Sequence, residues 1–514
     1  MGAPERRSEV KNSVGRIVLA GLTVIGQIIW LIVLAMRLNA YSTAISAFTT
    51  LLSIVIVLRI YASHRNTAMK MPWIMLILAF PLAGVCLYLM VGHLSLSRKM
   101  RKRFQKISAD LHPYHEQDEQ ILEDMEKENP RIANQSRYIS KFGNYPVCEN
   151  TDVLFYDEAE KGFEAQLQEI RKAEKFIFME YHAIEEAISF GRLREVLKER
   201  AANGVEVRII YDDVGSIGFL DWDFIKRMEK DGIRCKVFNP VIPVLNLFMN
   251  NRDHRKITVI DGEVGFVGGY NLADEYFNIT NPYGRWKDTG VRLQGDAVKN
   301  LTVTFLEMWN AIDKAENDYD RFFPEISYQA REKCFVQPYA DSPLDQERVG
   351  ESVYLNIIKN AKDYVYFTTP YLIITDEMNR EFELAAKRGV DVRIITPGIP
   401  DKKIVFKLTR SYYAGLVSNG VRIFEYTPGF CHAKQCVSDG EVATVGTINL
   451  DYRSLYQHFE NGVFFCGCDA VREVKLDFDR TFPLCEEVTE AYKTELSTAL
   501  KISQCILRLF APLL

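Results

Sequence analysis

Two copies of one polar pattern carry the residues of this chain that are best suited to chemistry. The first copy reads His254-Arg-Lys256-Ile-Thr-Val-Ile-Asp261-Gly-Glu-Val-Gly-Phe-Val-Gly268-Gly269-Tyr-Asn271. The second reads His432-Ala-Lys434-Gln-Cys-Val-Ser-Asp439-Gly-Glu-Val-Ala-Thr-Val-Gly446-Thr447-Ile-Asn449. Both fit the frame H-x-K-x4-D-G-E-V-x3-V-G-x2-N, at a constant offset of 432 − 254 = 178 residues. A lone H-x-K carries no signal, but a frame of this length occurring twice is very hard to obtain by chance.

Histidine and lysine two residues apart on a strand project from the same face. A lysine repels metal cations, so this pair predicts an anion site without a metal. The lysine would neutralise a phosphate oxygen while the histidine attacks phosphorus or moves a proton. Asn271 and Asn449, on the return strand of each copy, are candidate hydrogen-bond donors to the same phosphate. Two copies would place a nucleophile, a general acid and two ammonium groups around one phosphodiester.

The Asp-Gly step in each copy predicts a hairpin turn between two apolar strands. Asp261 and Asp439 lie seven residues beyond their histidines, which is about 20 Å along a strand that rises ~3.3 Å per residue. Both belong to the motif and stay among the candidate catalytic residues, but their position favours a turn or ion-pair role. The carboxylate that orients each histidine should therefore come from elsewhere.

The elements that position these residues are also written twice. Phe176-Ile-Phe-Met-Glu-Tyr is echoed by Tyr364-Val-Tyr-Phe-Thr-Thr, and Val205-Glu-Val-Arg-Ile-Ile by Val390-Asp-Val-Arg-Ile-Ile. Gly232-Ile-Arg-Cys-Lys-Val-Phe and Gly420-Val-Arg-Ile-Phe-Glu-Tyr form a third pair. Strands that alternate with helical stretches predict βαβ units and a largely parallel sheet. We therefore expect two α/β halves, residues 150–330 and 331–485, docked into one body.

The first part of the chain, residues 1–97, has the composition of a membrane region with about three apolar spans. Ile17 to Met36 and Leu38 to Leu58 are uncharged, and no charge occurs between Lys70 and Arg98. Twenty apolar residues at ~1.5 Å each reach about 30 Å, the thickness of one hydrocarbon core. The middle run is more polar and could re-enter rather than span.

Basic residues at both ends of this region compete to set its orientation. The denser cluster, from Arg98 to Lys106, follows the last run and favours a cytoplasmic catalytic body. Residues 98–149 form a basic juxtamembrane segment and a helical connector. The tail, residues 486–514, is amphipathic to apolar, and would lie on the bilayer or cover the second half.

The net charge and the cysteine content of the chain indicate what kind of protein it is. Lys+Arg number 63 and Asp+Glu 68, so the net charge is −5, which argues against a nucleic-acid-coating protein. Ten cysteines in 514 residues, without framework spacing, predict reduced and buried thiols.

The doubled frame resembles the phospholipase D superfamily, over roughly Asn150 to Cys485. Lys70-Met-Pro-Trp, Arg252-Asp-His-Arg-Lys and Asn449-Leu-Asp-Tyr-Arg-Ser-Leu resemble the bacterial cardiolipin synthases of that superfamily. The resemblance implies that one motif histidine forms a phosphohistidine and the other protonates the leaving alcohol, with His254 as nucleophile and His432 as acid. The residues alone leave these two roles interchangeable.

The resemblance also implies residues outside the frame. Glu460, 28 residues beyond His432, matches the family's histidine partner, and Asp288 is its counterpart in the first copy. Gly269 and Thr447 stand at one frame position where hydroxyls are common, so one half is expected to lack a phosphate-contacting hydroxyl.

The activity implied is phosphatidyl transfer between two phosphatidylglycerol molecules, giving cardiolipin and glycerol. The implied setting is a bacterial cell membrane with a multi-pass anchor, and neither a cofactor nor nucleic acid is required. Val241 to Met249, an apolar loop before the first frame, is a candidate lipid entrance. Two alternatives stay open: a membrane-anchored phosphodiesterase that hydrolyses phospholipid or nucleic acid, and a catalytically silent lipid-binding scaffold.

Overall fold

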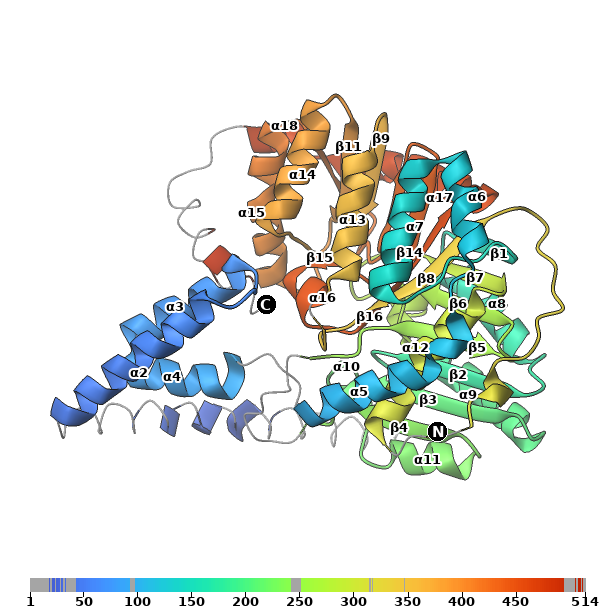
Figure 1. The fold of residues 1–514 in the computed structure, drawn as a ribbon, viewed down its shortest axis with the longest axis horizontal. Coiled ribbons are helices and arrows are strands. Elements are labelled where there is room, and N and C mark those ends of the chain that lie inside the picture. The colour runs from blue at the N-terminus through green and yellow to red at the C-terminus, as the bar shows by residue number, and fades with distance from the viewer. Residues whose placement is uncertain are drawn as a thin grey trace.

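The computed structural model describes residues 43–92, 98–241, 251–313, 316, 318–345 and 347–493, with isolated residues between 18 and 33 and between 504 and 511. Two sheets with matching strand orders form the body (Figure 1). The first has the order β1-β7-β6-β5-β2-β3-β4 and the second β17-β12-β11-β9-β13-β14-β16-β8. Read from β8, the second sheet repeats the first strand for strand and adds β17 at its edge. The two predicted α/β halves are thus present as a pseudo-twofold pair.

The elements of the first half are, in chain order, β1 (Thr151–Tyr156), α8 (Ala159–Ile170), β2 (Phe176–Tyr181), α9 (Ile188–Ala202), β3 (Glu206–Asp212), α10 (Asp213–Ser216), α11 (Phe224–Lys230), β4 (Arg234–Phe238), β5 (Lys256–Ile260), β6 (Val264–Gly268), β7 (Gly290–Gly295) and α12 (Val298–Ile312). Those of the second half are β8 (Phe335–Asp341), α13 (Val349–Asn360), β9 (Tyr364–Thr368), β10 (Leu372–Ile373), α14 (Asp376–Lys387), β11 (Asp391–Pro397), α15 (Lys403–Ser418), β12 (Arg422–Tyr426), β13 (Gln435–Ser438), β14 (Val442–Gly446), β15 (Leu450–Asp451), α16 (Tyr452–Tyr456), β16 (Glu460–Cys466), α17 (Asp469–Thr481), β17 (Cys485–Glu487) and α18 (Thr489–Lys493).

The prediction of a largely parallel sheet is wrong. In the first sheet β2, β3 and β4 pair in parallel, whereas β1, β7, β6 and β5 join one another and β2 in antiparallel register. The second sheet repeats this division. The physical reason is the hairpin in each frame: β5–β6 and β13–β14 are joined by tight turns, and a tight turn can only produce antiparallel strands.

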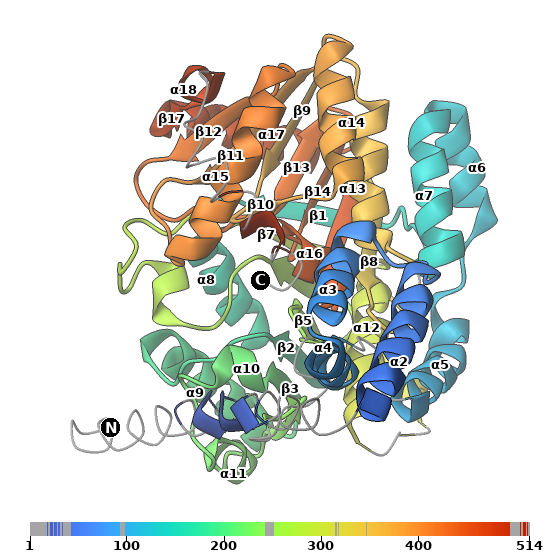
Figure 2. The same cartoon turned by 90° about the vertical axis from the view of Figure 1, so that its left-hand side faces the viewer.

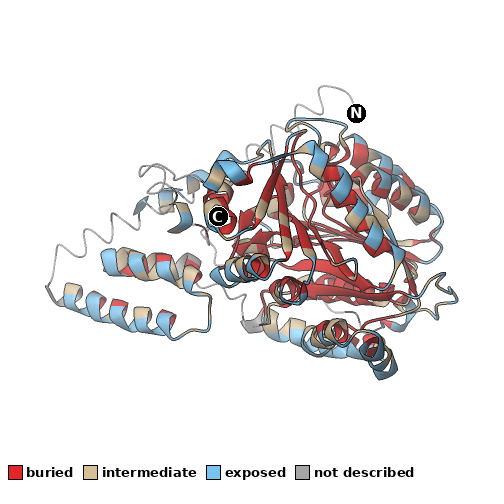
Figure 3. Cartoon of the chain, turned by 90° about the horizontal axis from the view of Figure 1, so that it is seen from above, coloured by how far each residue is buried: buried red, intermediate tan, exposed pale blue. Residues whose placement is uncertain are grey.

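The two halves share a core between their sheets. Helices α12 and α17 occupy this layer, where Phe305 and Trp309 of the first half lie in one apolar cluster with Val437 and Phe478 of the second. Further clusters lie on the outer face of each sheet. Figure 3 shows these buried strands enclosed by helices whose outer surfaces are exposed. Burial of a continuous apolar layer fixes the docking of the halves.

The amino-terminal helices extend away from this body in Figure 1 and lie on the side that faces the viewer in Figure 2. They are α2 (Thr43–Tyr61), α3 (Thr67–Ala79) and α4 (Pro81–Leu87), with the last two separated at Phe80 and Pro81. Half of the first predicted run, Ile17–Met36, lies outside the described residues. Among the helices that the structure describes, none combines the length and apolar character needed to cross a bilayer. The predicted connector is helical, as α5 (Arg98–Leu111), α6 (Glu119–Glu128) and α7 (Pro130–Gly143).

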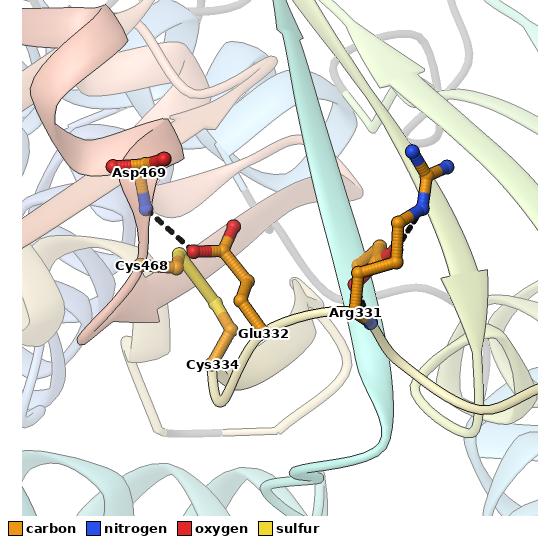
Figure 4. The surroundings of a disulfide bond; sticks show 6 residues. Arg331, Glu332, Cys334, Cys468 and Asp469 are labelled. Atoms are coloured by element: carbon orange, nitrogen blue, oxygen red, sulfur yellow. Dashed lines mark hydrogen bonds and ion pairs between the residues drawn. A yellow bond between two sulfur atoms is a disulfide. The ribbon is translucent and has the colours of Figure 1, made fainter.

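The prediction that all cysteines are reduced is wrong for one pair. Cys334, just before β8, is bonded to Cys468, just after the neighbouring strand β16 (Figure 4). The backbone N–H of Asp469 donates to Glu332 beside it, at 3.1 Å. The partners lie 134 residues apart, so their pairing depends on the strand order and could not be found from spacing.

Candidate active site

Each motif histidine is held by the backbone of the opposite half. The His254 N–H donates to the carbonyl of Phe459 at 2.9 Å, and the Phe459 N–H donates back to Arg252 at 2.8 Å. In the second frame, the His432 N–H donates to the carbonyl of Lys287 at 2.7 Å. Asp253, beside the first motif histidine, therefore pairs in parallel with Phe459 of the second half. Cys431, beside the second motif histidine, pairs in the same way with Lys287 of the first half.

The carboxylates cross between the halves in the same way. Nδ1 of His254 lies 2.9 Å from Oε1 of Glu460, the first residue of β16. Nδ1 of His432 lies 2.6 Å from Oδ2 of Asp288, two residues before β7. A carboxylate on Nδ1 favours the tautomer with its proton on that nitrogen, so Nε2 of each ring is left for chemistry. Glu460 and Asp288 thus stand where histidine-orienting groups are needed.

Both histidines face one cavity of about 430 Å³ between the halves. Its wall includes His254, His432, Asn271 and Asn449, so the structure brings both frames to one site. Further lining residues come from both halves: His182, Arg252, Glu275, Tyr276, Tyr283 and Trp286 from the first, and Tyr371, Asp401, Lys402, Asp451, Arg453 and His458 from the second. The proposed lipid entrance, Val241 to Met249, lies outside the described residues except for Val241.

The two motif lysines are buried directly behind the histidines. Lys256 Nζ donates to the carbonyl of His254 at 2.6 Å, and Lys434 Nζ donates to that of His432. Lys434 Nζ also lies 2.8 Å from Nδ1 of His432. That nitrogen carries the proton shared with Asp288, so we assign the Lys434 hydrogen bond to the carbonyl. Burial lowers the pKa of Lys256 to about 7 and that of Lys434 to about 8, although Glu460 and Asp288 oppose the shift.

The two histidine–carboxylate pairs differ in their electrostatics. Burial, reinforced by Lys434, lowers the pKa of His432 to about 3, and burial with Lys256 lowers the pKa of His254 well below its usual value. Burial also raises the pKa of Glu460 well above its ordinary range. The pKa of Asp288 ends below its usual value, because His432 and Lys434 outweigh burial. His432 therefore faces an ionised partner, which stabilises an imidazolium once a phosphate enters.

Asp261 and Asp439 lie at the hairpin turns, and neither lines the cavity. Asp261 accepts the backbone N–H groups of Glu174, Lys175 and Phe176, each at 2.8 Å. Asp439 accepts those of residues 362–364, each at 2.9 Å. Both aspartates and the glycines after them have positive φ, as a tight Asp-Gly hairpin requires. The aspartates therefore fasten each hairpin to the start of the neighbouring strand.

Gly269 and Thr447 both serve the crossing carboxylates. A Cβ at position 269 would lie 2.1 Å from Oδ1 of Asp288, so only glycine leaves room for that carboxylate. At the matching position, the hydroxyl of Thr447 donates to Glu460. We expected the difference between Gly269 and Thr447 to affect a phosphate contact. It instead follows from the carboxylate that each residue contacts, which is Asp288 for Gly269 and Glu460 for Thr447.

The two motif asparagines differ in their partners. Asn271 accepts from the Ala183 N–H at 3.2 Å and donates to the Tyr276 hydroxyl at 2.8 Å. Asn449 has a buried Oδ1 without a hydrogen-bond partner among the described residues. Both asparagines line the cavity, but the unpartnered oxygen of Asn449 can only accept a hydrogen bond, so it offers no contact to a phosphodiester.

Two further histidines surround His254, and the sequence pattern did not separate them from structural histidines. The ring centroid of His182 lies 5.0 Å, and that of His458 5.6 Å, from that of His254. His182 donates Nδ1–H to the Asp253 carbonyl at 2.8 Å. His182 directly follows β2, and His458 lies two residues before Glu460. Their closeness to strand ends was the only signal in the sequence.

His254, His458 and Glu460 form the one set of potential metal ligands that the described part of the chain contains, with donor atoms within 4.8 Å of one another. The neighbouring Lys256 ammonium opposes a divalent cation there, as its effect on the pKa of both histidines indicates. An ion at this position would also occupy a motif histidine.

Comparison with known proteins shows which family the chain is similar to. Residues 167–309 and 354–482 match the family model described as cardiolipin synthase, PLD-like domain, and residues 49–93 match the phospholipase D-nuclease N-terminal model. An uncharacterized protein of Streptococcus mutans is 41% identical over 89% of this chain and 99% of its own length. A cardiolipin synthase of Halalkalibacterium halodurans is 32% identical over 84% of this chain and 87% of its own length.

A solved structure shares the fold. The crystal structure of phosphatidylserine synthase from Haemophilus influenzae aligns with a TM-score of 0.54 at 13% identity, covering 74% of this chain and 97% of that chain. At this identity the likeness concerns the fold alone. The family models and the relatives together make the chain a member of the cardiolipin synthase family, within the phospholipase D superfamily.

Proposed function

We propose that the chain is a cardiolipin synthase that transfers a phosphatidyl group from one phosphatidylglycerol to another. The observation that carries this proposal is the pair of crossed histidine–carboxylate contacts, which places two Nε2 atoms at one cavity. Two imidazoles with buried lysines behind them can cleave a phosphodiester and form a new one. The phosphatidyl group stays bound to a histidine between the two steps and is not released.

In the first step, His432 takes up a proton on Nε2 as the anionic phosphate enters, and His254 Nε2 attacks the phosphorus of the donor lipid. A P–N bond forms, the P–O bond to the headgroup glycerol breaks, and His432 gives that proton to the departing oxygen. The ionised Asp288 at 2.6 Å supports this assignment, because it stabilises the protonated form of His432. Lys256 and Lys434 balance the charge on the non-bridging oxygens.

In the second step, a hydroxyl of the second phosphatidylglycerol attacks the phosphohistidine. His432, now neutral, takes the hydroxyl proton, a P–O bond forms and the P–N bond breaks. Cardiolipin leaves, and both histidines return to their starting states. A site that excludes water favours this alcohol over hydrolysis.

The amino-terminal helices would hold this site at the bilayer. Large apolar side chains are exposed along α2 and α3, among them Phe48, Leu51, Leu58 and Leu78. Exposed apolar surface of this extent requires a partner, and lipid is the partner that the substrate supplies. The basic helix α5 follows at once and would face anionic headgroups on the cytoplasmic side.

The test uses purified protein in phosphatidylglycerol vesicles, with lipid products measured by mass spectrometry. We expect cardiolipin and glycerol in equal amounts, and neither from His254→Ala or His432→Ala. Phosphatidic acid in place of cardiolipin would make the protein a phosphodiesterase instead. Absence of all lipid turnover by the folded wild-type protein would favour a silent scaffold.

A further inference from the structure

The two ends of the cavity, although related by the internal repeat, differ systematically in chemistry. The frame offset of 178 relates Arg252 to Phe430 and Glu275 to Arg453, and the offset of the crossing carboxylates, 460 − 288 = 172, relates Trp286 to His458. The His254 end of the cavity carries the cations and the imidazole, which belong to Arg252, Arg453 and His458. The His432 end carries their aromatic or acidic counterparts, Phe430, Glu275 and Trp286.

The end around His432 is walled by aromatic rings. The ring centroids of Trp286 and Tyr276 lie 5.1 and 5.4 Å from that of His432, and Phe430 lies at 5.8 Å. This wall offers apolar contact to the carbon atoms of a small headgroup. It contains no cation among the described residues except Lys402, at 5.7 Å from the ring of Tyr371.

Two polar groups at this end lack partners. The Glu275 carboxylate, which lines the cavity, makes no hydrogen bond or ion pair within the described residues, whereas its neighbour Asp401 is bound by the Tyr371 hydroxyl. The indole N–H of Trp286 also has no acceptor there, but it is closed off from the cavity, so a ligand meets only the indole ring. The Glu275 carboxylate accepts hydrogen bonds, so a ligand that satisfies it must donate one.

We propose that Glu275, Tyr276 and Trp286 form the subsite for an uncharged, hydroxyl-bearing headgroup, which selects glycerol at the His432 end of the cavity. This assignment rests on the proposed function and deepens it. A hydroxyl group donates to Glu275, and the rings of Tyr276 and Trp286 contact the carbon atoms beside it. The Lys402 ammonium group in the same wall would repel an ammonium headgroup.

The reverse reaction tests this subsite with a ligand that carries no phosphate. Cardiolipin gives one phosphatidyl group to the enzyme and releases phosphatidylglycerol, and free glycerol then accepts that group as a second phosphatidylglycerol. We expect Glu275→Ala, which removes a hydrogen bond, and Trp286→Ala, which removes a ring contact, each to raise KM for glycerol by about tenfold and to lower kcat less. Glu229→Ala and Trp222→Ala, which remove exposed side chains outside the cavity, serve as matched controls.

Each outcome has a separate meaning. An unchanged KM for glycerol in both cavity variants would overturn the subsite. Ethanolamine as a better acceptor than glycerol, with its use dependent on Glu275, would make this an ammonium site instead. If Trp286→Ala fails to fold, Glu275→Gln and Glu275→Ala still decide, since the Glu275 carboxylate supports no other side chain. Wild-type protein that makes no cardiolipin from phosphatidylglycerol would refute the proposed function itself.

Discussion

Glu460 binds Nδ1 of His254 at 2.9 Å although 206 residues and the boundary between the two halves separate them. Asp288 and His432, 144 residues apart, repeat the arrangement in the opposite direction. Neither half holds a histidine together with its carboxylate. The docked pair of halves is therefore needed to complete each histidine–carboxylate pair, and each step of the proposed mechanism uses residues from both halves.

Glu460→Gln should lower kcat by about 10²- to 10⁴-fold, because the amide can stabilise the wrong tautomer of His254. KM for phosphatidylglycerol should change far less, since the residue is buried behind the imidazole. Rates of cardiolipin formation in vesicles measure both constants. The exposed Glu229→Gln serves as control, and an equal loss in that variant would contradict a specific role for Glu460.

The two histidines should differ in whether they become phosphorylated. With a phosphodiester whose leaving group needs no proton, such as a p-nitrophenyl ester, His432→Ala should still form a covalent phosphoenzyme, because only the general acid is missing. His254→Ala should form none. Peptide mass spectrometry under alkaline conditions locates the adduct, and finding it on His432 would reverse the two assignments.

Gly269→Ala should reduce kcat by about tenfold or more, because the new methyl group would lie 2.1 Å from Oδ1 of Asp288 and displace the partner of His432. Gly191→Ala, on helix α9, is the matched control: no atom lies within 4 Å of the added Cβ. That variant should keep full activity and gain about 0.5 to 1 kcal/mol of stability. Equal activities in the two variants would count against the crowding argument.

Asp261→Ala should destabilise the protein without a direct effect on chemistry. It removes three hydrogen bonds from backbone N–H groups at the hairpin, a loss of about 1 to 2 kcal/mol at this exposed site. The midpoint of thermal unfolding should fall by a few degrees, while kcat of the folded fraction stays within about twofold. Asp223→Ala on the surface controls for loss of charge. A large fall in kcat at unchanged stability would restore a catalytic role.

The pH dependence of kcat/KM should have an alkaline limb. In the proposed mechanism Lys256 and Lys434, with pKa values of about 7 and 8, act as ammonium groups, so kcat/KM should decline as pH rises from 7 to 9. No acid limb is expected between pH 6.5 and 5.5, because the pKa of His254 lies well below its usual value. Initial rates in buffers of constant ionic strength measure the profile, and a maximum above pH 9 would contradict it.

The sequence was sufficient for features that depend on neighbouring residues. The doubled frame predicted the two histidines and lysines, and Asp-Gly at 261 and 439 predicted both hairpins. The same hairpins already implied antiparallel strands, so the expectation of a largely parallel sheet gave too much weight to the βαβ repeat. Local patterns of this kind are set by turn geometry and strand periodicity, which a single sequence displays directly.

Features that depend on docking could not be found in this way. The assignment of Glu460 to His254, rather than to the nearer His432, follows only from how the halves face each other. The roles of Glu275 and Trp286 likewise emerge from their position around His432. Isolated glutamates and tryptophans occur throughout the chain, and nothing in their spacing marks these two.

The crossing of the carboxylates also has an evolutionary consequence. A single ancestral copy would carry one histidine and one carboxylate that cannot reach each other. It would need a second identical molecule to form a histidine–carboxylate pair. Duplication and fusion would turn that symmetric dimer into one polypeptide. From then on each copy could mutate independently. Arg252 and Phe430, which occupy equivalent positions in the two halves, could then become different residues with different roles.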